Sequence, residues 1–175
     1  MERLSGENSV DIKLRVLRVS DVTQGYVNWF KDKEVVKFSN NQHRKFTLEG
    51  QQEYVDSCLK DGNTELYGIF DNDFHIGNIV ISGLKSKQKR AEIGFVIGEK
   101  SYWNKGIMTS MISQIIVLSK NIYNLNKLFS YSIPSNIGGI KVLEKNNFIQ
   151  EGILKDHVLL NNKYEDELCY SLILL

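Results

Sequence analysis

The sequence is poor in the residues and patterns that mark several common classes of protein. It has one proline and two cysteines among 175 residues, and 22 basic residues nearly balance 21 acidic ones. This balance lacks the clustered basic excess that a duplex-binding surface normally needs, so we expect no nucleic-acid partner. No run reaches the roughly 18 apolar residues of a membrane span, and the first residues carry no apolar signal segment. We therefore expect a cytoplasmic protein with reduced thiols and no membrane partner.

Cysteine and histidine are too scattered to indicate a metal centre. Cys58 and Cys169 lie far apart without CxxC spacing, and His43, His75 and His157 are equally dispersed. Zinc ligands usually come in closely spaced pairs, so we expect no metal. The length, the 42% hydrophobic content and the lack of repeats predict a single domain over residues 1–175.

Hydrophobic periodicity predicts alternating strands and helices. Ser20 or Asp21 is expected to cap the first helix and Thr47 the second, which ends at Gly62. The predicted helices span about 20–30, 47–59, 107–122 and 136–145. The predicted strands span 12–19, 66–70, 76–84, 91–97, 128–133, 148–154, 157–160 and 168–174. An antiparallel meander followed by a βαβ unit predicts a mixed sheet covered by helices.

The junction between the strand at 91–98 and the helix at Ile107 is the most informative segment. A short polar loop with Gly106 joins them. The first N–H groups of a helix lack intrahelical partners and lie at the positive end of its dipole, where phosphate can bind. The loop matches neither the Walker A nor the dinucleotide fingerprint. Periodicity alone favours a plain tight turn in which Gly106 only relieves steric strain.

Several segments together resemble the GCN5-related N-acetyltransferases, the GNAT superfamily. Residues 91–109 resemble the acetyl-CoA-binding core of that family, and 136–148 resemble its motif N-x-x-S-x-x-V-L-E-K-x-G-F. The resemblance implies an α/β (α+β) fold in which a mixed, mostly antiparallel sheet is flanked by helices. A splayed strand pair would form the CoA cleft. Likeness to the Rim-type ribosomal-protein and spermidine acetyltransferase branch is carried by residues 14–17, 26–32, 151–155, 161–166 and 170–172.

The resemblance implies acetyl-CoA as the acyl donor and cosubstrate. Loop amides would hold the pyrophosphate, an open strand edge would pair with the pantetheine arm, and an asparagine would hydrogen-bond near the pantetheine from the opposite wall. The implied coenzyme-binding residues are Phe95, Val96, Ile97, Trp103, Asn104, Lys105, Gly106, Ile107, Met108 and Asn136.

Some positions depart from the family pattern. Trp103 replaces the usual Gln or Arg, Met108 replaces a small residue, and Gly139 stands where the branch often has serine. Leu143 occupies the position at which many relatives carry a tyrosine acid, so we assign no general acid.

Acetyl transfer to an amine needs a base and a stabilised oxyanion. Glu92 matches a strand carboxylate of many relatives and is the candidate base, with an exposed strand glutamate as the plain alternative. A backbone N–H of Phe95 or Val96 would serve the oxyanion. For the acceptor, the aromatic and amide residues near the first two helices are the candidates, namely Trp29, Phe38 and Asn40.

The sequence therefore predicts an N-acetyltransferase that moves acetyl from acetyl-CoA to a primary amine by direct attack in a ternary complex. The amine would belong to an amino sugar, a protein N-terminus or a polyamine. A non-catalytic CoA-binding domain of the same fold is the main alternative, and a phosphate site for another nucleotide is a third. A homodimer is possible, since dimers are common in this branch.

Overall fold

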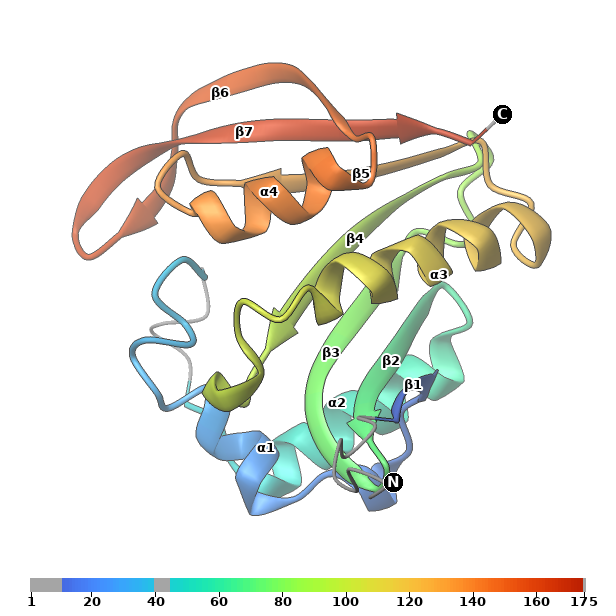
Figure 1. Cartoon of the computed structure of the whole chain (residues 1–175), viewed down its shortest axis with the longest axis vertical. Coiled ribbons are helices and arrows are strands. Elements are labelled where there is room, and N and C mark those ends of the chain that lie inside the picture. Colours follow the sequence, from blue (N-terminus) through green and yellow to red (C-terminus); the bar gives the residue numbers. More distant parts are fainter. Residues whose placement is uncertain (1–10, 40–44, 175) are drawn as a thin grey trace, which may run out of the picture.

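One seven-stranded sheet, in the order β1-β2-β3-β4-β5-β7-β6, organises the chain (Figure 1). The computed structural model describes residues 11–39 and 45–174. The strands are β1 (Ile12–Val16), β2 (Thr64–Asp71), β3 (Phe74–Ser82), β4 (Arg90–Ile97), β5 (Lys127–Ser132), β6 (Ile149–Leu160) and β7 (Lys163–Ile173). The α-helices are α1 (Gln24–Trp29), α2 (Leu48–Asp61), α3 (Ile107–Asn121) and α4 (Ile137–Lys145). The predicted order of strands and α-helices is confirmed, except that the two strands predicted within 148–160 form one strand.

The pairing of β4 with β5 sets this sheet apart from a simple meander. All other neighbouring strands pair antiparallel, whereas β4 and β5 run parallel. They pair only at Arg90 with Lys127, Ala91 with Leu128, and Glu92 with Phe129. Beyond Glu92 the two strands diverge (Figure 1). The predicted mixed, mostly antiparallel sheet with a splayed strand pair is therefore confirmed.

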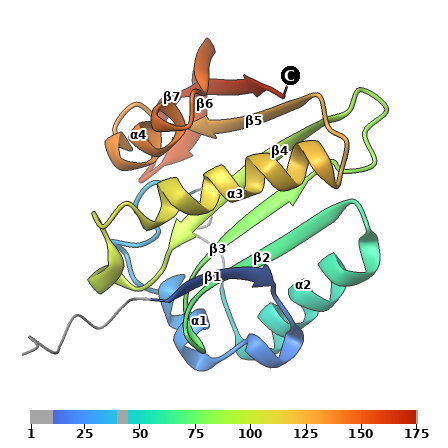
Figure 2. The same ribbon diagram turned by 45° about the vertical axis from the view of Figure 1, so that its right-hand side comes forward.

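Helices cover both faces of the sheet, and each face has its own core. On one face α3 crosses the central strands (Figure 2), and its buried Ile112 and Ile115 belong to the same cluster as Ile79 and Ile93. The opposite face carries α1 and α2. There the core contains Leu17, Val22, Tyr26, Trp29, Val55, Cys58, Leu66 and Phe70. Because side chains alternate along a strand, a central strand can contribute to both cores.

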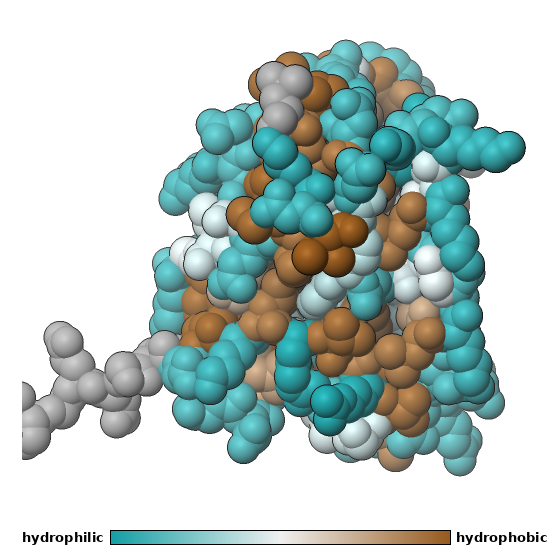
Figure 3. Space-filling view, turned by 90° about the vertical axis from the view of Figure 1, so that its right-hand side faces the viewer, coloured by the Kyte–Doolittle hydropathy of each residue, from teal (hydrophilic) through white to brown (hydrophobic). Residues whose placement is uncertain are grey.

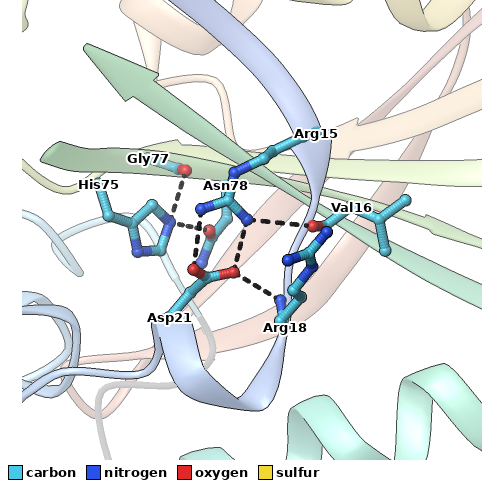
Figure 4. Close-up of polar contacts among 7 residues, drawn as sticks. All are labelled: Arg15, Val16, Arg18, Asp21, His75, Gly77 and Asn78. Carbon is cyan, nitrogen blue, oxygen red and sulfur yellow. Dashed lines mark hydrogen bonds and ion pairs between the residues drawn. The ribbon is translucent and has the colours of Figure 1, made fainter. Parts of the chain in front are cut away.

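The first helix differs from the prediction. Residues Val19–Asp21 form a separate 3-10 turn, and α1 is capped by Thr23, whose hydroxyl accepts from the Tyr26 N–H. Asp21 does not cap α1 because its carboxylate is occupied elsewhere, by the Arg15 guanidinium and the Arg18 N–H (Figure 4). The cap is therefore the side-chain oxygen nearest the helix start, and not that of Ser20 or Asp21.

The other predicted caps and strands are largely confirmed. The Thr47 hydroxyl accepts from the Gly50 N–H at the start of α2, and Gly62 ends that helix with a left-handed φ of 63°. Two predicted strands, 148–154 and 157–160, are one strand, β6. Its register shifts between Leu154 and Val158, where Asp156 has a φ of 48°. This bulge explains the break in the sequence pattern.

The surface shown in Figure 3 has a band of apolar side chains flanked by hydrophilic ones. Residues of α2, β2 and the segment after α3 enclose a cavity of about 390 Å³.

Within the described part of the chain, no helix is both long and apolar enough to cross a membrane.

Candidate active site

A cavity of about 1070 Å³ opens where β4 and β5 diverge. One side is formed by β4, the loop after it and the first turns of α3 and α4. The other side is formed by α1, the segment after it, and the start of α2. All of the predicted coenzyme-binding residues line this cleft: Phe95, Val96, Ile97, Trp103, Asn104, Lys105, Gly106, Ile107, Met108 and Asn136.

The start of α3 presents unpaired backbone donors to the cleft. Gly106 is the N-cap residue with a φ of 74°, and its lack of a side chain leaves open space above it. Among the described residues, no backbone or side-chain acceptor pairs with the N–H groups of residues 104–109. A run of free amides at a helix N-terminus, with Lys105 beside it, is suited to binding an anion.

Trp103 is an exception to the predicted set of loop amides. Its backbone N–H donates to the Lys100 carbonyl at 3.1 Å, so that amide is not free. Its indole Nε1–H donates to the Ile97 carbonyl at 2.8 Å. Trp103 therefore fixes the loop against the end of β4, and the free amides begin at Asn104.

The register of β4 decides which of its peptide groups face the splay. The Gly98 N–H donates to the Ile76 carbonyl at 2.9 Å. In an antiparallel pair every second residue directs its N–H and carbonyl to the same neighbour, so Val96, two residues before Gly98, also directs these groups to β3. Consistently, a Cβ on Gly77 would stand 2.5 Å from the Val96 carbonyl oxygen. Val96 thus pairs with β3, and Phe95 presents its N–H and carbonyl to the open edge. Of the two residues considered as oxyanion donor, the register favours Phe95.

Asn136 supports the opposite wall as the N-cap of α4. Its Oδ1 accepts from the Gly139 N–H at 3.1 Å. A Cβ on Gly139 would stand 2.5 Å from the Asn136 Nδ2. The glycine at this position, where relatives often have serine, therefore has a packing reason. Lys141 and Lys145 on α4 add positive charge to the same cleft.

Glu92 lies at the point where β4 and β5 separate. Ala91 and Ile93 are buried in the core under α3, so strand alternation turns Glu92 to the opposite face, where it lines the cleft. The pKa of Glu92 is raised above its ordinary value, first because protein partly surrounds the carboxyl and then because Glu167 carries a like charge nearby. Such a shift brings a carboxylate closer to the range useful for a general base.

Three tyrosine hydroxyls of the C-terminal strands lie in different environments. Tyr131 lines the cleft on β5, whereas Tyr164 is exposed and Tyr170 is buried with its hydroxyl near Glu144. Leu143, at the position where relatives carry a tyrosine, is fully buried in the core under α4.

The three residues predicted to contact the acceptor lie in different places relative to the cleft. Phe38 lines the cleft, and Asn40 lies outside the described residues. Trp29 does not line the cleft: it is 5% exposed, packs on Gly98 and donates its Nε1–H to Glu99 at 2.7 Å. In the structure Trp29 holds α1 against the end of β4, and this placement does not support its predicted contact with the acceptor.

Sequence reasoning missed three buried polar residues of the cleft wall, Tyr26, Gln51 and Asn78. A signal was present for two of them. Gln51 shares the buried face of α2 with Val55 and Cys58 at spacings of four and seven, and Asn78 interrupts the apolar stretch 76–81 of β3. Polar residues on apolar faces are uncommon unless a partner or a function retains them.

Comparison with known proteins agrees with this geometry. A family profile described as "Acetyltransferase (GNAT) domain" matches residues 11–149. The chain is 30% identical over 128 residues to the probable N-acetyltransferase YjcK of Bacillus subtilis, covering 69% of this chain and 70% of that one. It is 29% identical over 113 residues to the ribosomal-protein-serine acetyltransferase of Escherichia coli, covering 65% and 63% of the two chains.

Solved structures share the fold. Spermidine N-acetyltransferase from Vibrio cholerae, in complex with CoA and spermine, superposes with a TM-score of 0.83 at 19% identity, covering 95% of this chain and 96% of that one. RimL, a ribosomal L7/L12 alpha-N-protein acetyltransferase in complex with coenzyme A, gives 0.83 at 20% identity, covering 94% and 95%.

The fold, with its parallel and diverging β4–β5 pair, is that of these acetyltransferase structures. The chain belongs to the GNAT acetyltransferase family, and the predicted resemblance is confirmed. It is an acetyl-CoA-dependent acyltransferase.

Proposed function

We propose that this protein transfers the acetyl group of acetyl-CoA to a primary amine by direct attack in a ternary complex. The observation that carries this proposal is the cleft at the β4–β5 splay. It connects the free amides at the start of α3 with the Glu92 carboxylate on the opposite side of the sheet.

The residues present fit CoA. The amides of residues 104–109 would hold the pyrophosphate, and Lys105, Lys141 and Lys145 would offset its charge. The exposed edge of Phe95 would pair with the pantetheine amides as an added strand. When bound, acetyl-CoA supplies a thioester carbonyl that an amine can attack.

The chain's own groups would handle the protons and the developing charge. Glu92 would take a proton from the acceptor ammonium, directly or through one water molecule. The Phe95 N–H would donate to the oxygen on which negative charge develops. Tyr131 lies on the same wall, but we assign no acid, because the thiolate can take a proton from solvent.

Neither cysteine supports a covalent acetyl-enzyme route. Cys58 is buried in the core under α2, and Cys169 lies on β7; neither lines the cleft. Burial raises the pKa of both thiols, which lowers their thiolate content at neutral pH.

Two measurements test the proposal. Titration calorimetry with acetyl-CoA should show binding, and thiol release should appear when an amine is added from a panel of amino sugars, peptides with free N-termini and polyamines. A non-catalytic CoA-binding domain would bind acetyl-CoA but release no thiol with any amine. Displacement of acetyl-CoA by ATP or NAD at similar concentrations would instead favour a site for another nucleotide.

A further inference from the structure

The acceptor side of the cleft ends in a buried polar floor. Three of its side chains are polar and almost inaccessible: Tyr26 is 2%, Gln51 is 5% and Asn78 is 5% exposed. They come from α1, α2 and β3, and no sequence motif links them. Around them the wall is largely aromatic or aliphatic, formed by Phe30, Phe38, Phe46, Tyr54, Leu66 and Val80.

His75 fixes the orientation of Asn78. The His75 Nε2 lies 2.6 Å from the Asn78 Oδ1 and 3.0 Å from the Gly77 carbonyl oxygen (Figure 4). Both partners are acceptors, so Nε2 carries the proton and donates to them. The Asn78 Oδ1 is thereby occupied. Its Nδ2 carries two N–H donors, so after one contact with the Tyr26 hydroxyl a second donor remains for the floor.

Gln51 offers the complementary group. Its Oε1 is buried and has no hydrogen-bond partner among the described residues. Native proteins rarely leave such an atom unpaired without a reason, because burying an unmatched acceptor is unfavourable. Gln51 lines the cleft, but its Oε1 is itself inaccessible, so a bound hydrogen-bond donor would reach this atom once the carboxamide turns toward the cleft.

The charge of the wall argues against a polycation. Among the described lining residues the carboxylates are Glu34 and Glu92, and Glu34 is already bound by Lys100 at 2.9 Å. Lys37 and Lys45 line the same side. A polyamine carries several ammonium groups, each of which needs a carboxylate or carbonyl partner when it is enclosed.

We infer that the acceptor is a single amine on an uncharged, hydroxylated body, the chemistry of an amino sugar. A hydroxyl both donates and accepts, so it matches the Gln51 Oε1 and the Asn78 Nδ2, and the aromatic wall suits the apolar faces of a sugar ring. This inference rests on the proposed transferase function and specifies its substrate class.

The decisive variant is Gln51→Leu, with Gln52→Leu as its matched control. Gln52 is the next residue of α2 and does not line the cleft. The acceptors are D-glucosamine, cyclohexylamine (a six-membered ring without hydroxyls), spermidine and a short peptide with a free N-terminus. We expect glucosamine to have the highest kcat/KM. Gln51→Leu should lower that value by about 10- to 100-fold, leaving cyclohexylamine and the KM for acetyl-CoA little changed.

Thermal unfolding of the ligand-free protein separates a binding role from a structural one. Gln51→Leu removes an unpaired buried acceptor, so its melting temperature should rise above that of the wild type. A lower melting temperature would show that the Gln51 carboxamide supports the fold, which contradicts its assignment to the acceptor.

The inference is overturned if spermidine or the peptide is the best acceptor, or if Gln51→Leu affects glucosamine and cyclohexylamine equally. If acetyl-CoA binds but no amine releases thiol, the transferase proposal fails, and glucosamine binding measured by ligand-observed NMR then decides the present one. If glucosamine binds, and Gln51→Leu weakens this binding while Gln52→Leu does not, the acceptor inference stands. If glucosamine does not bind, the inference is overturned.

Discussion

At the scale of single residues, Glu92 combines a functional advantage with a cost in stability. Its pKa is raised above the ordinary value of 4.5 by burial and by Glu167. The folded state therefore holds the proton more strongly than the unfolded chain does. Because the folded state binds more protons between the ordinary and the raised pKa, the free energy of unfolding falls as the pH rises through that interval.

Glu92→Gln should separate the two effects. We expect kcat/KM to fall by about 10²- to 10⁴-fold and to lose its rise with pH on the acidic side. Relative to the wild type, the variant should gain stability in urea unfolding as the pH rises above the ordinary carboxyl pKa of 4.5 and through the raised pKa of Glu92. Glu167→Gln is the control: it should keep the acidic limb but move it to lower pH, since a like charge is removed. An unchanged pH profile in Glu92→Gln would rule out Glu92 as the base.

The ion pair between Arg15 and Asp21 is a second residue-scale feature with a pH signature. The two guanidinium nitrogens of Arg15 lie 2.6 and 2.8 Å from the Asp21 oxygens, and the guanidinium stacks 3.8 Å from the centre of the Phe70 ring (Figure 4 shows the ion pair). Asp21 also accepts from the Arg18 N–H at 2.7 Å. The Arg15 bond, then the Arg18 bond, hold the pKa of Asp21 below its ordinary value of 3.8.

Asp21→Asn should reduce the free energy of unfolding at pH 7 by about 1–3 kcal/mol, the range for hydrogen bonds to charged groups. A lowered carboxyl pKa stabilises the fold above the unfolded value, and this stabilisation is lost as the pH falls through the folded one. The difference between the wild type and the variant should therefore shrink below about pH 4. Asp11→Asn breaks an exposed pair with Lys13 and should have a much smaller effect. Equal losses of unfolding free energy in Asp21→Asn and Asp11→Asn would show that the bidentate Arg15–Asp21 pair stabilises the fold no more than an exposed ion pair does.

At the scale of elements, three glycines at helix starts should respond differently to the same change. Gly106 has a left-handed φ of 74° with open space above it, and Gly138 lies in α4, where a Cβ would have nothing within 4 Å. At Gly139 a Cβ would stand 2.5 Å from the Asn136 Nδ2. Gly106 therefore tests backbone conformation, Gly138 tests helix propensity, and Gly139 tests the geometry of the Asn136 cap.

Urea unfolding of the three Gly→Ala variants, without ligand, measures these effects. Gly106→Ala should destabilise by about 1–2 kcal/mol because a Cβ is unfavourable in the left-handed region. Gly138→Ala should stabilise by up to about 1 kcal/mol through helix propensity. Gly139→Ala should fall about 1 kcal/mol below Gly138→Ala, since the gain in propensity is offset by the displaced Asn136 cap. The same stability for the last two would show that the cap tolerates the methyl group.

Elements defined by local chemistry were predictable from the sequence, and those defined by distant contacts were not. The caps Thr47 and Gly62 are local, so the bounds of α2 followed from the sequence. The start of α1 did not, because Asp21 is taken by Arg15 on a strand rather than by its own helix.

The site divides in the same way. Its proposed coenzyme side is built mainly from one strand–loop–helix junction, which the sequence displays in order. Its proposed acceptor floor joins side chains from α1, α2 and β3, and no local pattern brings Gln51 and Asn78 together. Trp29 lies outside the cleft although it is close in sequence to other aromatic residues, because closeness in sequence does not show which way a side chain faces.

At the scale of the whole molecule, three residue pairs between β4 and β5 join the two halves of the sheet. Beyond them the strand edges are open, and a bound pantetheine arm would bridge the halves. Ligand binding to the folded state alone adds about 2.7 kcal/mol of stability at a ligand concentration about 100 times Kd. We therefore expect the gain in stability on CoA binding to be accompanied by slower amide hydrogen exchange along the splay, and not by an equal slowing over the whole chain.

Amide hydrogen exchange with and without CoA tests this directly. The N–H groups of Phe95 and of residues 104–109 lack acceptors in the described structure, so they should exchange quickly and slow when CoA is added. Two amides beside them serve as internal controls. The Trp103 N–H already donates to Lys100, and the Val96 N–H faces β3, so CoA should change their protection less. Adenosine, which lacks the phosphates, should not protect residues 104–109. Slowing confined to β6 and β7, with Phe95 unchanged, would show that CoA binds elsewhere than the opening between the strands.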